Sequence, residues 1–89
     1  MHSQKTTIQN EHGIHVRPAQ LLVQTANKFA SDIKLVAEDG RRVEAKSILG
    51  IMTLGLTKGA ALTIEANGVD EEAAVAELVA LFDSKFGEE

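Results

Sequence analysis

The apolar residues of this chain switch repeatedly between the spacing of a strand and the spacing of a helix, an order that few folds accommodate. Alternating or β-branched side chains predict strands at residues 5–9, 32–37, 42–45 and 60–66. Helical spacing predicts helices from residue 18 to about residue 30, from 47 to about 53, and from 70 to the last residues. The predicted order is therefore β-α-β-β-α-β-α.

This order points to one α+β domain spanning residues 1–89. Four short strands cannot close a barrel, and each helix has one apolar stripe that must be buried. We therefore predict an open-faced β-sandwich, in which the helices cover one face of the sheet. The Asp39-Gly40 turn signal predicts an antiparallel hairpin between the second and third strands. The pattern leaves the other strand pairings open.

Composition excludes several functional classes. The chain has no cysteine, and 13 acidic against 9 basic side chains give a net charge of −4. An acidic balance disfavours binding to nucleic acid or to anionic membranes, both of which require a basic face. No apolar run approaches the roughly 20 residues of a membrane span. We expect a cytoplasmic monomer without disulfides, metal, cofactor, nucleic-acid partner or membrane insertion.

The most informative stretch is residues 13–19, Gly-Ile-His-Val-Arg-Pro-Ala. Proline is favoured at the first position of a helix, so Pro18 predicts a helix that begins there. The backbone amides at the start of a helix lack partners and carry partial positive charge, which makes a site for an anion. His15 lies beside that site, where the positive helix end favours the neutral, nucleophilic ring.

The neighbours of His15 suit phosphoryl chemistry. The amides of Val16 and Arg17, together with the Arg17 guanidinium, can hold a phosphate dianion. A residue before proline favours extended geometry, so we expect Arg17 just outside the first helical turn. Gly13 allows the sharp turn that exposes the ring.

Other interpretations of the histidines carry less weight. An isolated His15 would more often be a loop residue at a helix start than a reactive group. His12 and His15 are three residues apart, but no third ligand accompanies them, so we expect no metal site. A small hydrolase is a weak alternative because Glu11 is the only nearby acid and the loop has no serine or cysteine nucleophile.

A second informative stretch covers residues 46–55. Ser47 is a good N-cap for the short helix that follows, and Ile51 and Leu54 are expected in the core. Three further apolar residues are more than one short helix can bury: Ile48, Leu49 and Met52. An exposed apolar patch beside a reactive loop predicts a docking surface.

The remaining charged residues have structural interpretations. Asp70 is expected to cap the last helix, with Glu71 and Glu72 in its first turn and Lys85 in its last. Five scattered basic residues are taken as ordinary surface charge: Lys34, Arg41, Arg42, Lys46 and Lys58.

The string at residues 13–19, in a chain of this length and element order, resembles the active-site signature of the HPr family of phosphocarriers. These proteins serve the phosphoenolpyruvate-dependent phosphotransferase system. The resemblance covers essentially the whole chain and implies a four-stranded antiparallel sheet with three helices on one face. It implies that His15 is phosphorylated on Nδ1 by phospho-enzyme I and passes the group to enzyme IIA domains. It also implies that Arg17 assists the transfer, without a cofactor and without turnover of the protein alone.

The segment from Ser47 onwards resembles the regulatory site of the same family. That resemblance implies that HPr kinase/phosphorylase phosphorylates Ser47, which would place about −1.5 to −2 charge beside the docking residues. Val16 and Gln20 occupy positions where the family commonly has small residues, so we expect them to affect docking. The C-terminal residues resemble the nitrogen-branch carriers, whereas residues 53–59 resemble the sugar-branch carriers. The alternative function is a mainly regulatory interaction protein that acts through the Ser47 helix.

Overall fold

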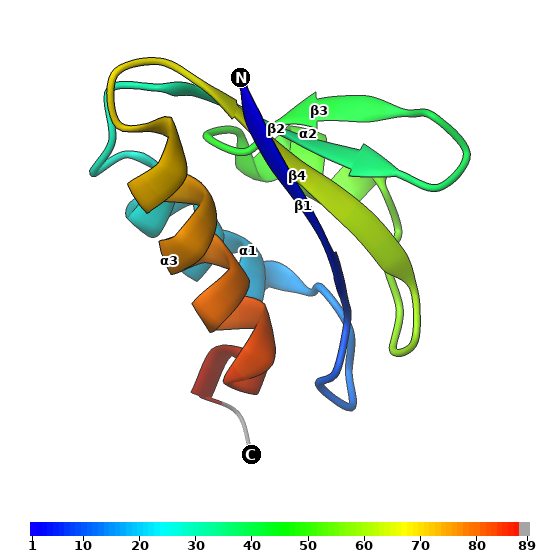
Figure 1. Ribbon diagram of the computed structural model, residues 1–89. Coiled ribbons are helices and arrows are strands. Elements are labelled where there is room, and N and C mark those ends of the chain that lie inside the picture. Colours follow the sequence, from blue (N-terminus) through cyan, green and yellow to red (C-terminus); the bar gives the residue numbers. More distant parts are fainter. Residues whose placement is uncertain (88–89) are drawn as a thin grey trace.

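The computed structural model describes residues 1–87, and these residues contain the predicted order of elements (Figure 1). The strands are β1 (His2–Thr7), β2 (Asp32–Ala37), β3 (Arg42–Glu44) and β4 (Ala61–Asn67). The helices are α1 (Val16–Ala26), α2 (Ile48–Thr53) and α3 (Glu71–Asp83), and a short 3-10 turn, η1 (Lys85–Gly87), follows them. The predicted α+β fold is confirmed.

The strands form one antiparallel sheet in the order β1-β4-β2-β3. The chain therefore places its first and last strands side by side, with Thr6 opposite Leu62. The predicted hairpin joins β2 to β3 through residues 38–41, a longer connection than a two-residue turn. Gly40 has φ +94° in this loop, and its N–H donates to the Ala37 carbonyl at 3.0 Å.

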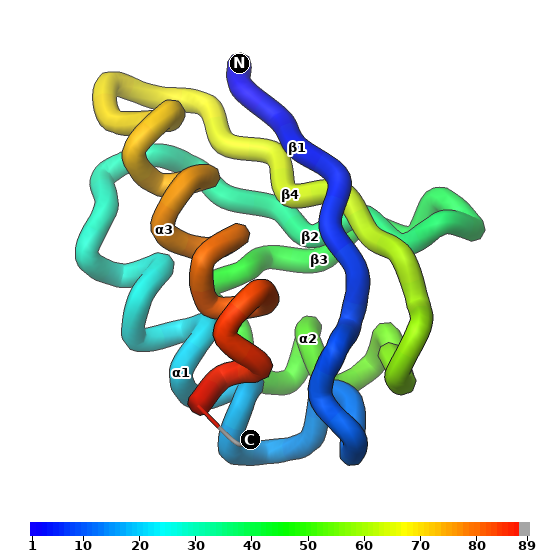
Figure 2. Tube along the Cα trace, turned by 60° about the horizontal axis from the view of Figure 1, so that its bottom comes forward, coloured from blue at the N-terminus to red at the C-terminus, as the bar shows by residue number. Residues whose placement is uncertain are grey.

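One face of the sheet is buried beneath the helices, as the alternation predicts. In the two central strands every second side chain is buried: Ile33, Leu35, Ala37, Leu62, Ile64 and Ala66. Helix α3 packs against β1 and β4, and α1 packs against both α2 and α3. Figure 2 shows the helices gathered on this side of the sheet. Each large apolar side chain buried there stabilises the fold by about 1.5–3 kcal/mol.

The predicted boundaries of β1 and α1, the latter expected from residue 18 to about residue 30, are wrong at both ends. Strand β1 spans His2–Thr7 rather than residues 5–9, because backbone pairing with β4 extends to His2 opposite Ala66. Such pairing needs no apolar pattern at an exposed edge. Helix α1 begins at Val16, two residues before Pro18, and ends at Ala26. Proline fits this third position because no N–H in the first turn has an intrahelical acceptor.

Asp70 stands at the N-cap of α3, but its side chain does not cap that helix. Instead its carboxylate accepts hydrogen bonds from the Ala30 and Ser31 N–H groups, at 2.9 and 3.0 Å, and from the Ser31 hydroxyl. Glu71 accepts a hydrogen bond from the Gly68 N–H at 3.1 Å. Asp70 therefore ties the start of α3 to the loop that precedes β2.

The end of α3 also differs from the prediction. The helix ends at Asp83, so Lys85 lies beyond it, in η1, rather than in its last turn. Lys85 and Phe86 both have left-handed backbone angles, with φ of 58° and 56°. This reversal turns Phe86 into the core, where its ring meets the edge of Phe82 at a centroid distance of 5.0 Å.

We predict that Asp70→Asn destabilises the protein near neutral pH and has little effect in acid. The Ser31 hydroxyl, followed by the Ala30 N–H, holds the pKa of Asp70 below its ordinary value. A lowered pKa in the folded state stabilises the protein above the unfolded pKa of about 3.9, and this stabilisation is lost as the pH falls through the folded pKa. The Tm of the variant should lie a few degrees below that of the wild type at pH 7, and the two values should converge towards pH 2.

Glu72→Gln is the matched control, because it removes an acidic charge from the same helix start without touching Ser31. Its effect on Tm should be smaller than that of Asp70→Asn at pH 7. Equal losses from the two variants would contradict the role of Asp70 as a tie and leave only an interaction with the helix dipole.

Candidate functional site

The loop between β1 and α1 is held against the segment before β4 by backbone hydrogen bonds at both of its ends. At the first end, the Ile8 N–H donates to the Ala60 carbonyl at 2.9 Å, and the Gly59 N–H donates to the Ile8 carbonyl at 2.8 Å. At the second end, the Ile14 N–H donates to the Leu56 carbonyl at 3.0 Å. The backbone that leads into His15 is therefore fixed on both sides.

Gly13 makes the second of these contacts possible. Its φ is +66°, and a Cβ atom at this position would lie 2.6 Å from the Leu56 carbonyl oxygen and 2.9 Å from Thr57 Cα. Its N–H donates to the Asn10 carbonyl at 3.2 Å, and the Asn10 side-chain amide donates to the Gly13 carbonyl. The sharp turn predicted at Gly13 is thus a close approach of two backbones as well.

His15 is the N-cap residue of α1. Its backbone is extended, with φ −103° and ψ −167°, and its side chain forms no capping hydrogen bond. Its carbonyl accepts the Ala19 N–H at 3.0 Å, which begins the helix. The side chain is half-buried, and its Nε2 atom is buried. The ring therefore lies at the start of a helix, as predicted, beside first-turn amides that have no acceptor within the helix.

Arg17 lies inside the first turn of α1, so its predicted place outside the helix is wrong. The preference of a pre-proline residue for extended geometry is overcome because Pro18 and Ala19 are buried in helical geometry. Arg17 is exposed and lies two residues after His15, so its guanidinium faces solvent at the positive end of the helix.

A second imidazole, that of His12, lies beside His15. The two ring centroids are 6.1 Å apart and the planes are inclined at 76°, an edge-to-face arrangement. In the sequence, the only sign of this pair is the three-residue spacing between the two histidines. Within residues 1–87 no group of three or more histidine, cysteine, aspartate or glutamate side chains is arranged to hold a metal ion.

Helix α2 presents apolar side chains to solvent, as predicted. Leu49 is 80% exposed, and Ile48 and Met52 are 39% and 37% exposed, whereas Ile51 and Leu54 are buried. α2 packs against α1, where Val16 is 54% exposed and Gln20 is exposed. Five exposed residues of these two adjacent helices are the ones predicted to contact partners, and we call them the docking surface: Val16, Gln20, Ile48, Leu49 and Met52.

Ser47 caps α2, which confirms the predicted N-cap. Its Oγ atom accepts the Gly50 N–H at 3.1 Å, and the side chain is half-buried. At the other end of the helix, the Arg41 guanidinium donates to the Thr53 and Leu54 carbonyls at 3.1 and 3.2 Å. Arg41, taken from the sequence as ordinary surface charge, therefore satisfies the end of α2 and holds it against the β2–β3 loop.

Comparisons with known proteins agree with this geometry. The family model described as "PTS HPr component phosphorylation site" matches residues 2–84. Phosphocarrier protein HPr of Cupriavidus necator is 43% identical over 83 residues, which cover 93% of this chain and 92% of that protein.

Two solved structures from Thermoanaerobacter tengcongensis are also similar. The structure of HPr-C-His has a TM-score of 0.94 with 48% identity, covering 100% of this chain and 99% of that chain. The structure of an HPr dimer has a TM-score of 0.78 with 49% identity, covering 99% and 100% of the two chains. The expectation of a monomer stays a prediction. No helix within residues 1–87 is long and apolar enough to cross a bilayer.

We predict that Gly13→Ala destabilises the protein by about 2–4 kcal/mol, because the new Cβ adds a backbone clash to left-handed strain. The measurement is urea unfolding. Gly55→Ala is the control: Gly55 has φ +59° but a Cβ there meets no atom within 4 Å. It should cost only the left-handed strain, about 1–2 kcal/mol. Equal losses at the two positions would show that the contact with Leu56 does not matter.

Proposed function

This chain belongs to the HPr family of phosphocarrier proteins of the phosphotransferase system, and we propose that it carries its phosphoryl group on His15. The donor in this proposal is phospho-enzyme I, and the acceptors are enzyme IIA proteins, in the cytoplasm. The observation that carries the proposal is the position of His15 as the N-cap of α1, half-buried beside amides without helical partners.

The ring geometry supports Nδ1 as the acceptor atom. Nε2 of His15 is buried, which disfavours this atom as the acceptor and favours Nδ1. In the transfer, the lone pair of Nδ1 forms the new N–P bond while the bond from phosphorus to the donor breaks, and the electron pair of that bond stays with the donor. In the second transfer the new bond breaks in the same way, and His15 returns to its first state.

The start of α1 supplies the groups that hold the phosphoryl oxygens. The amides of Val16 and Arg17 belong to the first helical turn, where N–H groups have no intrahelical acceptor. The exposed Arg17 guanidinium adds a charge and a forked pair of donors. Their contribution to catalysis is positioning and preformed electrostatics, completed by the active site of the partner.

We predict that His15→Ala abolishes phosphorylation by phosphoenolpyruvate, magnesium and enzyme I. The wild-type protein should gain one phosphate that is labile in acid and stable in alkali, as expected for a phosphohistidine. His2→Ala, which changes a histidine on β1, should be phosphorylated like the wild type. Phosphate that survives in His15→Ala would overturn the assignment.

The docking surface is the proposed contact for enzyme I and enzyme IIA. Its exposed apolar side chains lie on α2 and on the first turns of α1, the helix that His15 caps. An adaptable methionine and a prominent leucine are the kinds of side chain that bind several partners.

Regulation through Ser47 is the second candidate function. The hydroxyl of Ser47 lies at the N-cap of α2, immediately before Ile48 and Leu49 of the docking surface. A phosphate there would be stabilised by the amides at the start of α2. It would place about −1.5 to −2 charge beside the exposed apolar side chains of Ile48 and Leu49. HPr kinase/phosphorylase is the enzyme proposed to add it. This regulation would be additional to the relay through His15.

We predict that Ser47→Asp and Leu49→Ala both weaken the binding of enzyme I. Truncation of Leu49 removes the most exposed apolar contact of the docking surface and should raise the Kd about tenfold. Aspartate keeps the N-cap of α2 while it adds negative charge beside that contact, so a severalfold rise is expected. Isothermal titration calorimetry measures both.

The controls for this experiment lie elsewhere on the chain. Val69→Ala truncates a side chain that is 93% exposed but lies in the loop before α3. Ser3→Asp adds the same charge on β1. Neither should change the Kd. An unchanged Kd for Ser47→Asp would count against a charge-based switch, and an unchanged Kd for Leu49→Ala would move the docking surface away from α2.

A further inference from the structure

The relay through His15 leaves the neighbouring imidazole of His12 without a role. The two ring centroids are 6.1 Å apart, on either side of Gly13, whose backbone lies against Leu56 and Thr57. His12 is exposed, whereas His15 is half-buried. A group bound to the His15 ring would therefore have a second imidazole in its neighbourhood.

The charged side chains recorded beside His12 in this loop region are those of Glu11, Lys58 and Lys85. Glu11 is ionised and paired, because Lys58 donates to its carboxylate at 3.1 Å. That hydrogen bond is the main cause that lowers the pKa of Glu11, and the charges of Lys58, His12 and Lys85 act in the same direction. Histidine is the only one of these side chains that ordinarily titrates between pH 5 and 8.

Two further charged groups belong to the elements packed around this loop. Arg17 lies in the first turn of α1 and stays charged throughout this pH range. Asp83, the last residue of α3, accepts a hydrogen bond from the Gln9 side-chain amide at 3.4 Å. Aspartate and arginine side chains ordinarily change charge outside the neutral range, so neither residue type is the source of a pH dependence there.

We infer that protonated His12 stabilises the phosphoryl group on His15 and makes the phosphoryl-transfer equilibrium depend on pH. This inference rests on the proposed phosphorylation of His15. The His12 and His15 ring centroids are 6.1 Å apart. At a separation of that order, in a solvent-exposed setting, a single positive charge favours a phosphoryl group of about −1.5 to −2 charge by about three- to tenfold.

The direction of the pH dependence follows from linkage. The proposed stabilisation requires the imidazolium form of His12, so it is lost when rising pH removes the second proton of the ring. The coupling is reciprocal, so phosphorylation of His15 must make His12 hold its second proton to a higher pH. A purely structural role for His12 would produce neither effect.

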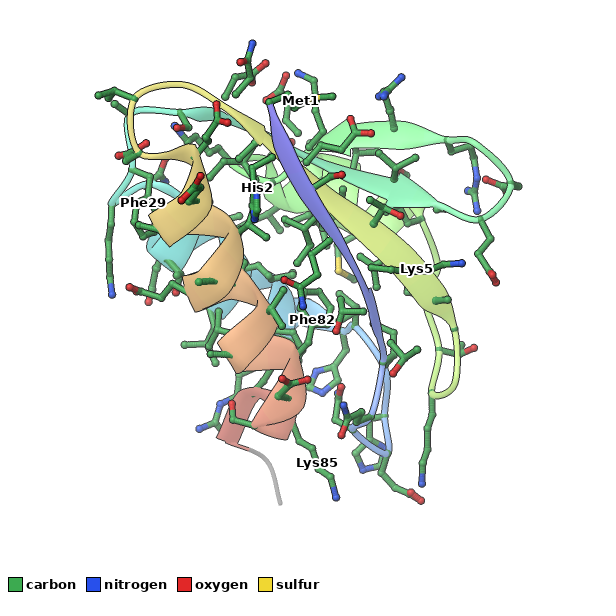
Figure 3. The ribbon with its side chains drawn as sticks, viewed as in Figure 1. Met1, His2, Lys5, Phe29, Phe82 and Lys85 are labelled. Atoms are coloured by element: carbon green, nitrogen blue, oxygen red, sulfur yellow. The ribbon has the colours of Figure 1, made fainter. Side chains whose placement is uncertain are left out.

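The test compares three proteins at the same pH values from 5.5 to 8.5: wild type, His12→Asn and His12→Lys. Each is equilibrated with phosphoenolpyruvate, pyruvate, magnesium and enzyme I, and the phosphorylated fraction is measured by mass spectrometry. At a given pH, the pH dependence of the donor reaction affects all variants equally, so it cancels in the ratio of their equilibrium constants for phosphorylation. His2→Asn is the matched control. The charge of Lys85 acts on Glu11, next to His12, and Figure 3 shows Lys85 and His2 towards opposite ends of the molecule.

At pH 5.5 the equilibrium constant for phosphorylation of the wild type should exceed that of His12→Asn about three- to tenfold. At pH 8.5 the two should agree, whereas His12→Lys should keep its advantage because lysine remains charged. Proton NMR of the His12 ring should show the titration midpoint at higher pH after phosphorylation. His2→Asn should match the wild type throughout.

The outcomes separate this inference from the proposed function. If all four proteins are phosphorylated on His15 but wild type and His12→Asn have the same ratio at every pH, the role of His12 is overturned and the phosphocarrier function stands. If the wild type carries no phosphate on His15, both fail. A constant ratio between His12→Asn and wild type, independent of pH, would show a structural effect and would also overturn the inference.

Discussion

The position of His15 depends on one close approach between two backbones, which a residue without a side chain makes possible. The pairing of β1 with β4 continues past the strands, through the hydrogen bonds that join Ile8 to Gly59 and Ala60. The loop then returns to the same segment, where Ile14 meets Leu56 with Gly13 between the two chains. Because Ile8 and Ile14 are buried, both ends of the loop are fixed by the core. His15 directly follows this fixed segment, at the point where α1 begins.

The docking surface is held by groups other than the residues that form it. A helix of six residues is too short to be stable by itself, so α2 depends on its surroundings. Ile51 and Leu54 anchor it in the core, Ser47 satisfies an amide at its start, and Arg41 satisfies two carbonyls at its end. The exposed side chains are consequently presented on an ordered backbone, so binding of a partner would not have to offset the entropic cost of ordering it.

The order of elements, the buried face and the Ser47 cap could be predicted from the sequence because each follows from a local pattern. Alternation in β2 and β4 reports which face is buried, and a serine before an apolar turn reports a cap. The start of α1 could not be predicted from Pro18. The N–H groups of the first three helical positions have no intrahelical acceptor, so proline is tolerated at each of them. The partners of Asp70 and Arg41 lie far along the chain. Only the approach of the start of α3 to the loop before β2, and of the end of α2 to the β2–β3 loop, brings them into reach.

The exposure of the site suits a group that must be released as readily as it is accepted. Val16 and Arg17 are exposed, so in the proposed relay each contact with a phosphoryl oxygen would compete with water. Near a protein surface such contacts contribute about 1 kcal/mol each rather than the much larger values of a dry interior. A buried site made of the same residues would hold a phosphoryl group too tightly for a second transfer. The proposed relay thus combines a fixed loop, which determines where His15 lies, with a solvated, partly positive helix start, which would leave the group exchangeable. In the same proposal, partners that exclude water on docking would strengthen these contacts at the moment of transfer.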